Sequence, residues 1–108
     1  MHWLFSYGSL QQPAVQLSTF GRLLGGREDV LPGFELRMVR HGERQFANVI
    51  RSGNAHDTVP GMVFEISDAE LAAADEYERA DTYTRIAARL SSGLEAWLYV
   101  DAASLHQG

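Results

Sequence analysis

The sequence predicts a single α+β domain over residues 1–108, in which short helices flank a small, mixed, mostly antiparallel β-sheet or barrel. The chain has 108 residues, enough for one hydrophobic core and too few for two. Short segments rich in β-branched and aromatic residues outnumber helical segments, and glycine or proline separates many of them. Strands and helices do not alternate regularly, which disfavours a doubly wound parallel sheet.

The first half of the chain reads as a strand, a helix and then further strands. Bulky residues alternate loosely over residues 2–7, and a weakly amphipathic helix is expected with Pro13 in its first turn and its end near Gly21. Gly25 and Gly26 signal a turn. An extended segment over 30–39 is interrupted near its start by a proline and a glycine. After them, apolar and charged side chains alternate, which predicts a half-buried strand. Its alternating apolar residues are Phe34, Leu36 and Met38, and the next strand is expected over 46–50.

The second half holds the longer helix. A strand is expected over residues 59–66 and a helix over 68–78. Ser67 and Glu70 form the S-x-x-E pattern of a capping box, which starts such a helix. Two further strands are expected over residues 82–90 and 96–100, and the tail from Asp101 onward is expected to fray.

Composition narrows the classes of function. The formal net charge is −5, and the nine basic residues are scattered arginines, so a nucleic-acid partner is not expected. No apolar run is long enough to cross a membrane, and the N-terminus lacks the pattern of a signal peptide. Cysteine is absent, which removes disulfides, thiolate metal sites and a cysteine nucleophile. We therefore expect a cytoplasmic protein.

Glu78 falls where the second helix should be apolar. At about 100° per residue, Leu71 and Glu78 share one face of the helix. A carboxylate there would be partly desolvated and near the negative end of the helix dipole, and both effects raise its pKa. Such a group can both accept and donate a proton. Two alternatives stay open: the helix ends earlier and Glu78 is solvated, or Glu78 pairs with Arg85.

The neighbouring acids have a simpler interpretation. Asp75, Glu76 and Asp81 are expected to form a solvated, charged helix end. A metal site built from these acids is disfavoured, because the run lacks the loop glycine of an EF-hand and a partnering histidine. Metal-assisted hydrolysis is kept only as a further option, and we expect neither a metal nor a cofactor.

The segment from Tyr7 to Leu10 is a second candidate for function. A strand that ends in Tyr-Gly-Ser can expose several backbone N–H groups in a concave turn, which can cradle a carboxylate. Gly8 would supply conformational freedom and Ser9 a hydroxyl donor. The alternative is an ordinary turn between a strand and a helix. Ser9 lies in no G-x-S-x-G elbow, so a serine hydrolase has little support.

Four segments in order resemble the gamma-glutamylcyclotransferase-like, or AIG2-like, family. FSYGSLQQP at residues 5–13 resembles the family's YGSL segment, and GFEL at 33–36 its next strand opening. VPGMVFEI at 59–66 is similar to a later strand, and ADEYERADTYTR at 74–85 resembles its L-D-x-Y-E and Y-x-R elements. Ala74 departs from the usual leucine, and residues 79–81 replace a turn containing glycine and proline.

The resemblance implies a small mixed β-barrel with flanking helices and an enzyme that releases 5-oxoproline from a gamma-glutamyl compound. It implies that Glu78 is the general acid/base. It also implies binding of the glutamyl group by the turn residues and a pocket wall at Tyr83, whereas Arg85 either supports the site or forms a structural pair. The leaving amine stays open. The alternative is a non-catalytic module for small ligands or interactions on the same fold, with Trp3 or Phe64 filling the pocket. The implied turn residues are Tyr7, Gly8, Ser9 and Leu10.

Overall fold

A computed structural model describes residues 1–106 and confirms the α+β class. Every strand and helix predicted with bounds agrees with an observed element to within two residues at each end, except the extended segment predicted over 30–39. That segment is divided between two strands. The elements are β1 (His2–Ser6), the 3₁₀ helix η1 (Ser9–Gln11), α1 (Pro13–Phe20), β2 (Gly26–Pro32), β3 (Phe34–His41), β4 (Arg44–Arg51), β5 (Thr58–Ile66), α2 (Asp68–Arg79), β6 (Tyr83–Arg89), β7 (Glu95–Asp101) and the 3₁₀ helix η2 (Ala102–His106).

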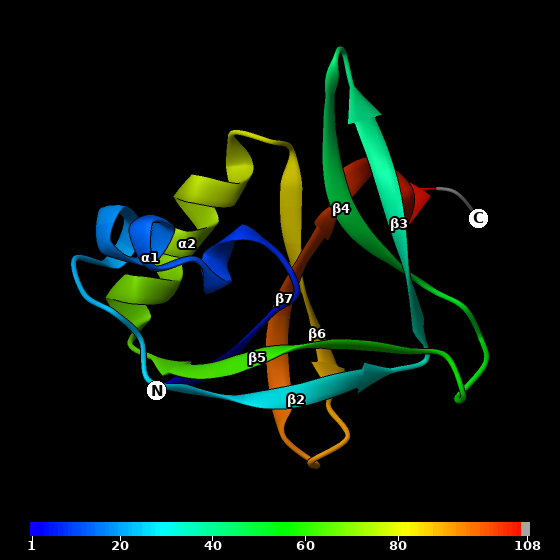
Figure 1. Cartoon of the computed structure of the whole chain (residues 1–108), viewed down its shortest axis with the longest axis horizontal. Coiled ribbons are helices and arrows are strands. Elements are labelled where there is room, and N and C mark those ends of the chain that lie inside the picture. Colours follow the sequence, from blue (N-terminus) through cyan, green and yellow to red (C-terminus); the bar gives the residue numbers. More distant parts are fainter. Residues whose placement is uncertain (107–108) are drawn as a thin grey trace.

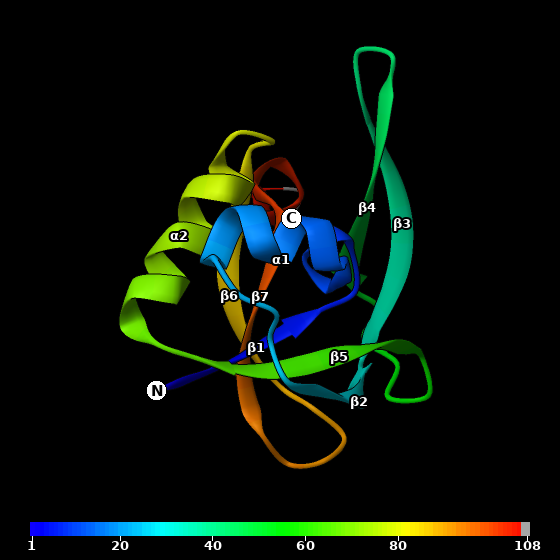
Figure 2. The same ribbon diagram turned by 60° about the vertical axis from the view of Figure 1, so that its left-hand side comes forward.

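The strands form an open five-stranded sheet and a separate hairpin. The sheet has the order β2-β5-β1-β7-β6, in which only the β1–β7 pair is parallel among the described residues. Strands β3 and β4 pair with each other, and both views show this hairpin projecting beyond the rest of the molecule (Figures 1 and 2). Over residues 1–106 the strands therefore curl without closing into a complete barrel.

The sheet buries apolar side chains on both faces, because successive residues of a strand point to opposite sides. In β1, Leu4 packs on the side covered by α1 and α2, together with Leu71 and Ala74 of α2. The next residue, Phe5, packs on the other side with Leu98 of β7 and residues from the base of the hairpin. Helices α1 and α2 lie side by side in both views (Figures 1 and 2).

Helix α2 begins as the capping box predicts. The Ser67 hydroxyl accepts from the Glu70 backbone N–H at 3.1 Å, and Glu70 accepts from the Ser67 N–H at 2.9 Å. Glu70 also pairs with Arg22 beyond the end of α1, with 2.6 Å between Nε and Oε2. These contacts fix the start of α2 against α1, so the direction of its last turn is set by the packing of the helices.

Three expectations are wrong. Leu36 and Met38 are 54% and 59% exposed, because β3 pairs only with β4 and, within residues 1–106, is not part of the five-stranded sheet. Gly26 lies in β2 instead of a turn, and a Cβ there would come within 2.4 Å of the Phe64 ring. The tail does not fray at Asp101, which is 4% exposed and accepts from the Ala103 N–H at 3.2 Å. Residues 107 and 108 lie outside the described range.

No helix within residues 1–106 has the length and apolar character needed to cross a membrane.

Candidate active site

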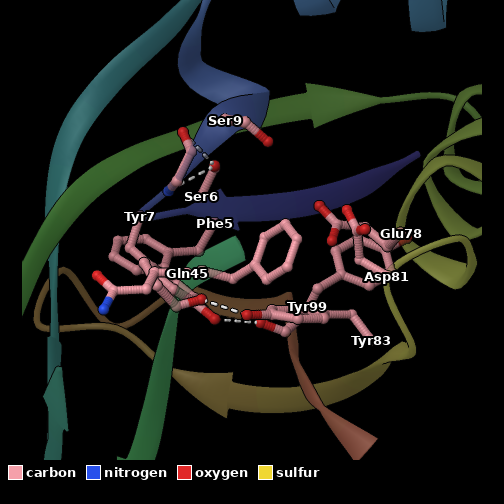
Figure 3. Close-up of a pocket in the computed structure, with 12 residues that line it drawn as sticks. Phe5, Ser6, Tyr7, Ser9, Gln45, Glu78, Asp81, Tyr83 and Tyr99 are labelled. Atoms are coloured by element: carbon pink, nitrogen blue, oxygen red, sulfur yellow. Dashed lines mark hydrogen bonds between the residues drawn. The ribbon is translucent and has the colours of Figure 1, made fainter. Parts of the chain in front are cut away.

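A cavity of about 230 Å³ lies where the turn after β1, the end of α2 and strand β4 meet (Figure 3). Glu78, Tyr7, Gly8, Ser9 and Tyr83, five of the six residues predicted for the site, line it. Candidates that are far apart in the sequence therefore share one cavity. The full lining comprises Phe5, Ser6, Tyr7, Gly8, Ser9, Gln45, Phe46, Ala47, Glu78, Asp81, Tyr83 and Tyr99.

Leu10 is the sixth predicted residue, and its side chain points elsewhere. It is 2% exposed and packs in the core between the sheet and the helices. Only its backbone is available to the turn. The rings of Trp3 and Phe64 pack in the two cores and do not line the cavity.

Glu78 lies on the last turn of α2, half-buried, with its carboxyl in the cavity. Burial, together with the smaller effect of the nearby Asp81 carboxylate, raises the pKa of Glu78 to about 7. Within residues 1–106 no hydrogen bond or ion pair of this carboxyl opposes the shift. The alternative pairing with Arg85 is wrong, because Arg85 pairs with Asp75 at 3.0 Å.

Asp75 is not part of a solvated helix end. Its carboxylate accepts from the Tyr99 hydroxyl at 2.7 Å as well as from Arg85. The Arg85 guanidinium in turn lies 4.4 Å from the centre of the Trp97 ring, a cation–π contact. Asp75 thus joins α2 to β6 and β7 one helical turn before Glu78. Glu76 is exposed as expected and pairs with Arg79 at 2.7 Å.

Two tyrosines form rigid walls of the cavity. The Tyr7 hydroxyl donates to the backbone carbonyl of Tyr99 at 2.6 Å, and the Tyr83 hydroxyl donates to that of Ala47 at 2.5 Å (Figure 3). Burial raises the pKa of Tyr7 above its ordinary value and that of Tyr83 to about 12. Both hydroxyls are therefore neutral donors near pH 7. They tie the turn to β7 and the hairpin to β6.

The turn itself is closed by backbone hydrogen bonds. The N–H of Gln11 donates to the Gly8 carbonyl at 3.1 Å, and that of Gln12 to the Ser9 carbonyl at 2.9 Å. The N–H groups of Ser9 and Leu10 are the first two of η1, so they have no acceptor inside that helix. The Ser9 hydroxyl is 2.8 Å from the Tyr77 hydroxyl of α2, which joins the turn to the helix that carries Glu78.

Gly8 contributes space instead of an unusual conformation. Its φ is −136°, outside the left-handed region that favours glycine. A Cβ added there would meet nothing within 4 Å, so a side chain would extend into open space beside the cavity.

Several lining residues carry no signal in the sequence. Tyr99 comes from β7, and the hairpin supplies Gln45, Phe46 and Ala47. Their segments carry only ordinary strand patterns, and no local signal indicates which strands meet at the cavity. Asp81 was assigned to the solvated helix end, although it lines the cavity. Among residues 1–106, no group of three or more histidine, aspartate and glutamate side chains is arranged to hold a metal ion.

Comparison with known proteins agrees with this architecture. The family model described as gamma-glutamyl cyclotransferase, AIG2-like, matches residues 4–107. The chain belongs to this family. No curated protein matches the chain.

Several solved structures share the fold. An Arabidopsis thaliana protein known from a solution structure is 25% identical, with a TM-score of 0.76 over 95% of this chain and 63% of its own. An AIG2-like protein from Mus musculus is 20% identical, with a TM-score of 0.72 over 98% and 83% of the two chains. A protein named gamma-glutamyl cyclotransferase is 16% identical, with a TM-score of 0.72 over 92% and 65%. The chain thus spans 63% of the length of the Arabidopsis protein.

Proposed function

We propose that the protein is a γ-glutamyl cyclotransferase, which converts a γ-glutamyl amide into 5-oxoproline and a free amine. One observation carries the proposal: a half-buried carboxyl with a pKa near 7, Glu78, shares a cavity with the turn from Tyr7 to Ser9. Membership of the AIG2-like family supports it.

The proposed reaction is an intramolecular acyl transfer. The α-amino nitrogen of the substrate attacks its own γ-carbonyl carbon, a new C–N bond closes the five-membered lactam, and the bond to the leaving nitrogen breaks. The Glu78 carboxylate accepts a proton from the α-ammonium and then gives a proton to the leaving amine. A carboxyl with a pKa near 7 suits both transfers, because its two protonation states are similar in energy at neutral pH.

The turn would hold the glutamyl group folded on itself. The N–H groups of Ser9 and Leu10, which have no acceptor inside η1, would donate hydrogen bonds to the α-carboxylate, and this gives Leu10 a role through its backbone alone. Tyr7 and Tyr83 would confine the chain of the substrate, since hydrogen bonds hold both rings in place. Gly8 leaves room for this compact conformer. Fixing the two reacting groups side by side supplies the orientation on which an intramolecular attack depends.

The test is release of 5-oxoproline from a panel of γ-glutamyl amines, amino acids and peptides. Wild type and Glu78→Gln are compared under the same conditions. Glu76→Gln is the matched control, because it makes the same change on an exposed side chain of the same helix. We expect Glu78→Gln to lose about 10²- to 10⁴-fold in kcat/KM, the usual contribution of a general acid/base. Glu76→Gln should keep the wild-type rate.

Equal rates for wild type and Glu78→Gln on every substrate would contradict the proposal. If neither protein released 5-oxoproline while γ-glutamyl compounds still bound at the cavity, the chain would be a non-catalytic binding module instead. Binding is measured by chemical shift changes of the lining residues.

A further inference from the structure

We propose that Asp75 is a positioning residue for the reaction: it holds the Arg85 guanidinium against β6 and β7, and so keeps this cation from pairing with the Glu78 carboxyl. This role rests on the proposed function, because it concerns the group that would transfer the protons. The ion pair of Asp75 and Arg85 lies outside the cavity lining, so its effect on the reaction would pass through Glu78.

Two carboxyl groups of α2 lie within reach of one cation. Asp75 and Glu78 are three residues apart, which makes them neighbours on one side of the helix, with about 5–6 Å between their Cβ atoms. On β6, Tyr83 lines the cavity together with Glu78. Arg85 follows Tyr83 on the same face of the strand, about 7 Å further along, and pairs with Asp75. Arg85 thus lies one step outside the cavity, next to both acids.

Asp75 and two residues of β7 hold the guanidinium in this place. Oδ2 of Asp75 accepts from Nη1 of Arg85 at 3.0 Å, and its Oδ1 accepts from the Tyr99 hydroxyl at 2.7 Å. Arg85 and Tyr99 are cross-strand partners in the β6–β7 pair. The Trp97 ring lies on the guanidinium, 4.4 Å from it. Because the pair is partly buried, salt screens it less than a surface pair.

Few charges face Glu78 from the elements packed around it. Among residues 1–106 no base lines the cavity, and the lining part of the hairpin carries no titratable side chain. Burial is the main cause that raises the pKa values of the facing tyrosines, so their hydroxyls are neutral near pH 7. The facing titratable residues are Asp81 after α2, Tyr7 after β1, Tyr83 on β6 and Tyr99 on β7.

Loss of the Asp75 charge would release Arg85 toward Glu78. An opposite charge within about 4–6 Å favours the ionised form of a carboxyl, and the pair would make Glu78 a weaker base. A weaker base accepts a proton from the substrate's ammonium less readily. Asp75 would therefore preserve the proton affinity that burial gives to Glu78.

The test measures the titration midpoint of the Glu78 carboxyl by ¹³C NMR in wild type, Asp75→Asn, Arg85→Gln and the double variant. Asparagine keeps the shape of the aspartate and an oxygen that can accept from the Tyr99 hydroxyl. We expect Asp75→Asn to lower the midpoint by about one to three pH units, the usual effect of a nearby opposite charge. The acid inflection of kcat/KM for 5-oxoproline release should move with it.

The other variants fix the sign of the effect. Arg85→Gln leaves the Asp75 carboxylate unbalanced beside Glu78 and should raise the midpoint. The double variant removes both charges and should return the midpoint close to that of wild type. Glu76→Gln is the matched control, because it breaks an ion pair with Arg79 on the exposed side of the same helix. It should leave the midpoint unchanged.

A midpoint that is unchanged in Asp75→Asn, even with a reduced kcat, would give the pair a purely structural role and overturn the proposal. A lowered midpoint that persists in the double variant would also overturn it, because Arg85 could not then be the cause. Failure of wild type to release 5-oxoproline would contradict the proposed function instead. The titration midpoints would still decide whether Asp75 keeps Arg85 away from Glu78.

Discussion

Glu78 and Asp81 lie three residues apart at the end of α2, and no cation lines the cavity that they share within the described chain. The raised pKa of Glu78 has burial as its larger cause and the charge of Asp81 as its smaller one. The chemistry that we propose therefore depends mainly on where the helix places the carboxyl group, and only secondarily on its neighbour.

This order of causes can be measured. We expect the side-chain carboxyl carbon of Glu78 to titrate with a midpoint of about 7 in ¹³C NMR, assigned by comparison with Glu78→Gln. In Asp81→Asn the midpoint should fall, because a like charge is removed, and should stay above the ordinary value of 4.5, because burial remains. A midpoint near 4.5 in wild type would show that the carboxyl is solvated.

At the scale of the elements, α2 was the most predictable part of the molecule. Its capping box fixes the start, and the spacing from Leu71 to Glu78 correctly puts the glutamate on the inward side. Local pattern also gave the other helix and most strand positions. It failed where long-range packing decides. The alternation in β3 predicted a buried face, yet Leu36 and Met38 are exposed, because β3 and β4 form a sheet of their own.

The cavity was predictable only in part for the same reason. A carboxyl group on an apolar helix face and a Tyr-Gly-Ser turn are signals within single segments. The wall formed by Gln45 and Tyr99 comes from β4 and β7, whose meeting depends on the topology of the sheet. Asp75 likewise read as one more surface acid, because its partners Tyr99 and Arg85 lie on other strands.

The hydrogen bond between the Ser9 and Tyr77 hydroxyls joins the turn to α2 and can be tested by a double-mutant cycle. We expect Tyr77→Phe and Ser9→Ala each to raise KM by about three- to tenfold, the worth of one hydrogen bond. Because both remove the same bond, the double variant should cost little more than either single one. Steady-state kinetics measure all four proteins.

Additive losses in that cycle would show that the two hydroxyls act independently. A much larger loss for Ser9→Ala than for Tyr77→Phe would show that the Ser9 hydroxyl also contacts the substrate.

At the scale of the whole molecule, the cavity lies where the turn after β1, α2 and the hairpin meet. The raised pKa of Glu78 that suits the proposed proton transfers also lowers the stability of the folded chain. The folded chain holds a carboxyl with a pKa near 7, whereas the unfolded chain restores the ordinary value of 4.5. Between these pH values the folded state binds more protons than the unfolded state. The free energy of unfolding contributed by Glu78 therefore falls as pH rises from about 4.5 to about 7.

Replacing Glu78 should thus stabilise the protein at high pH. We expect Glu78→Gln to raise the free energy of unfolding by on the order of 2 kcal/mol at pH 8 and to change it little at pH 4. Urea titrations at the two pH values measure the difference, and Glu76→Gln is again the control, since its carboxyl is exposed. A Glu78→Gln protein that is less stable than wild type at pH 8 would contradict the assignment of a desolvated carboxyl.

The pH dependence of kcat/KM for 5-oxoproline release tests most directly the claim that Glu78 performs the proton transfers. In the free enzyme Glu78 must be a carboxylate to accept the first proton. We therefore expect kcat/KM of wild type to fall about tenfold per pH unit below an inflection near pH 7. A profile that stays flat from pH 5 to pH 8, or that turns down only near pH 4.5, would contradict it.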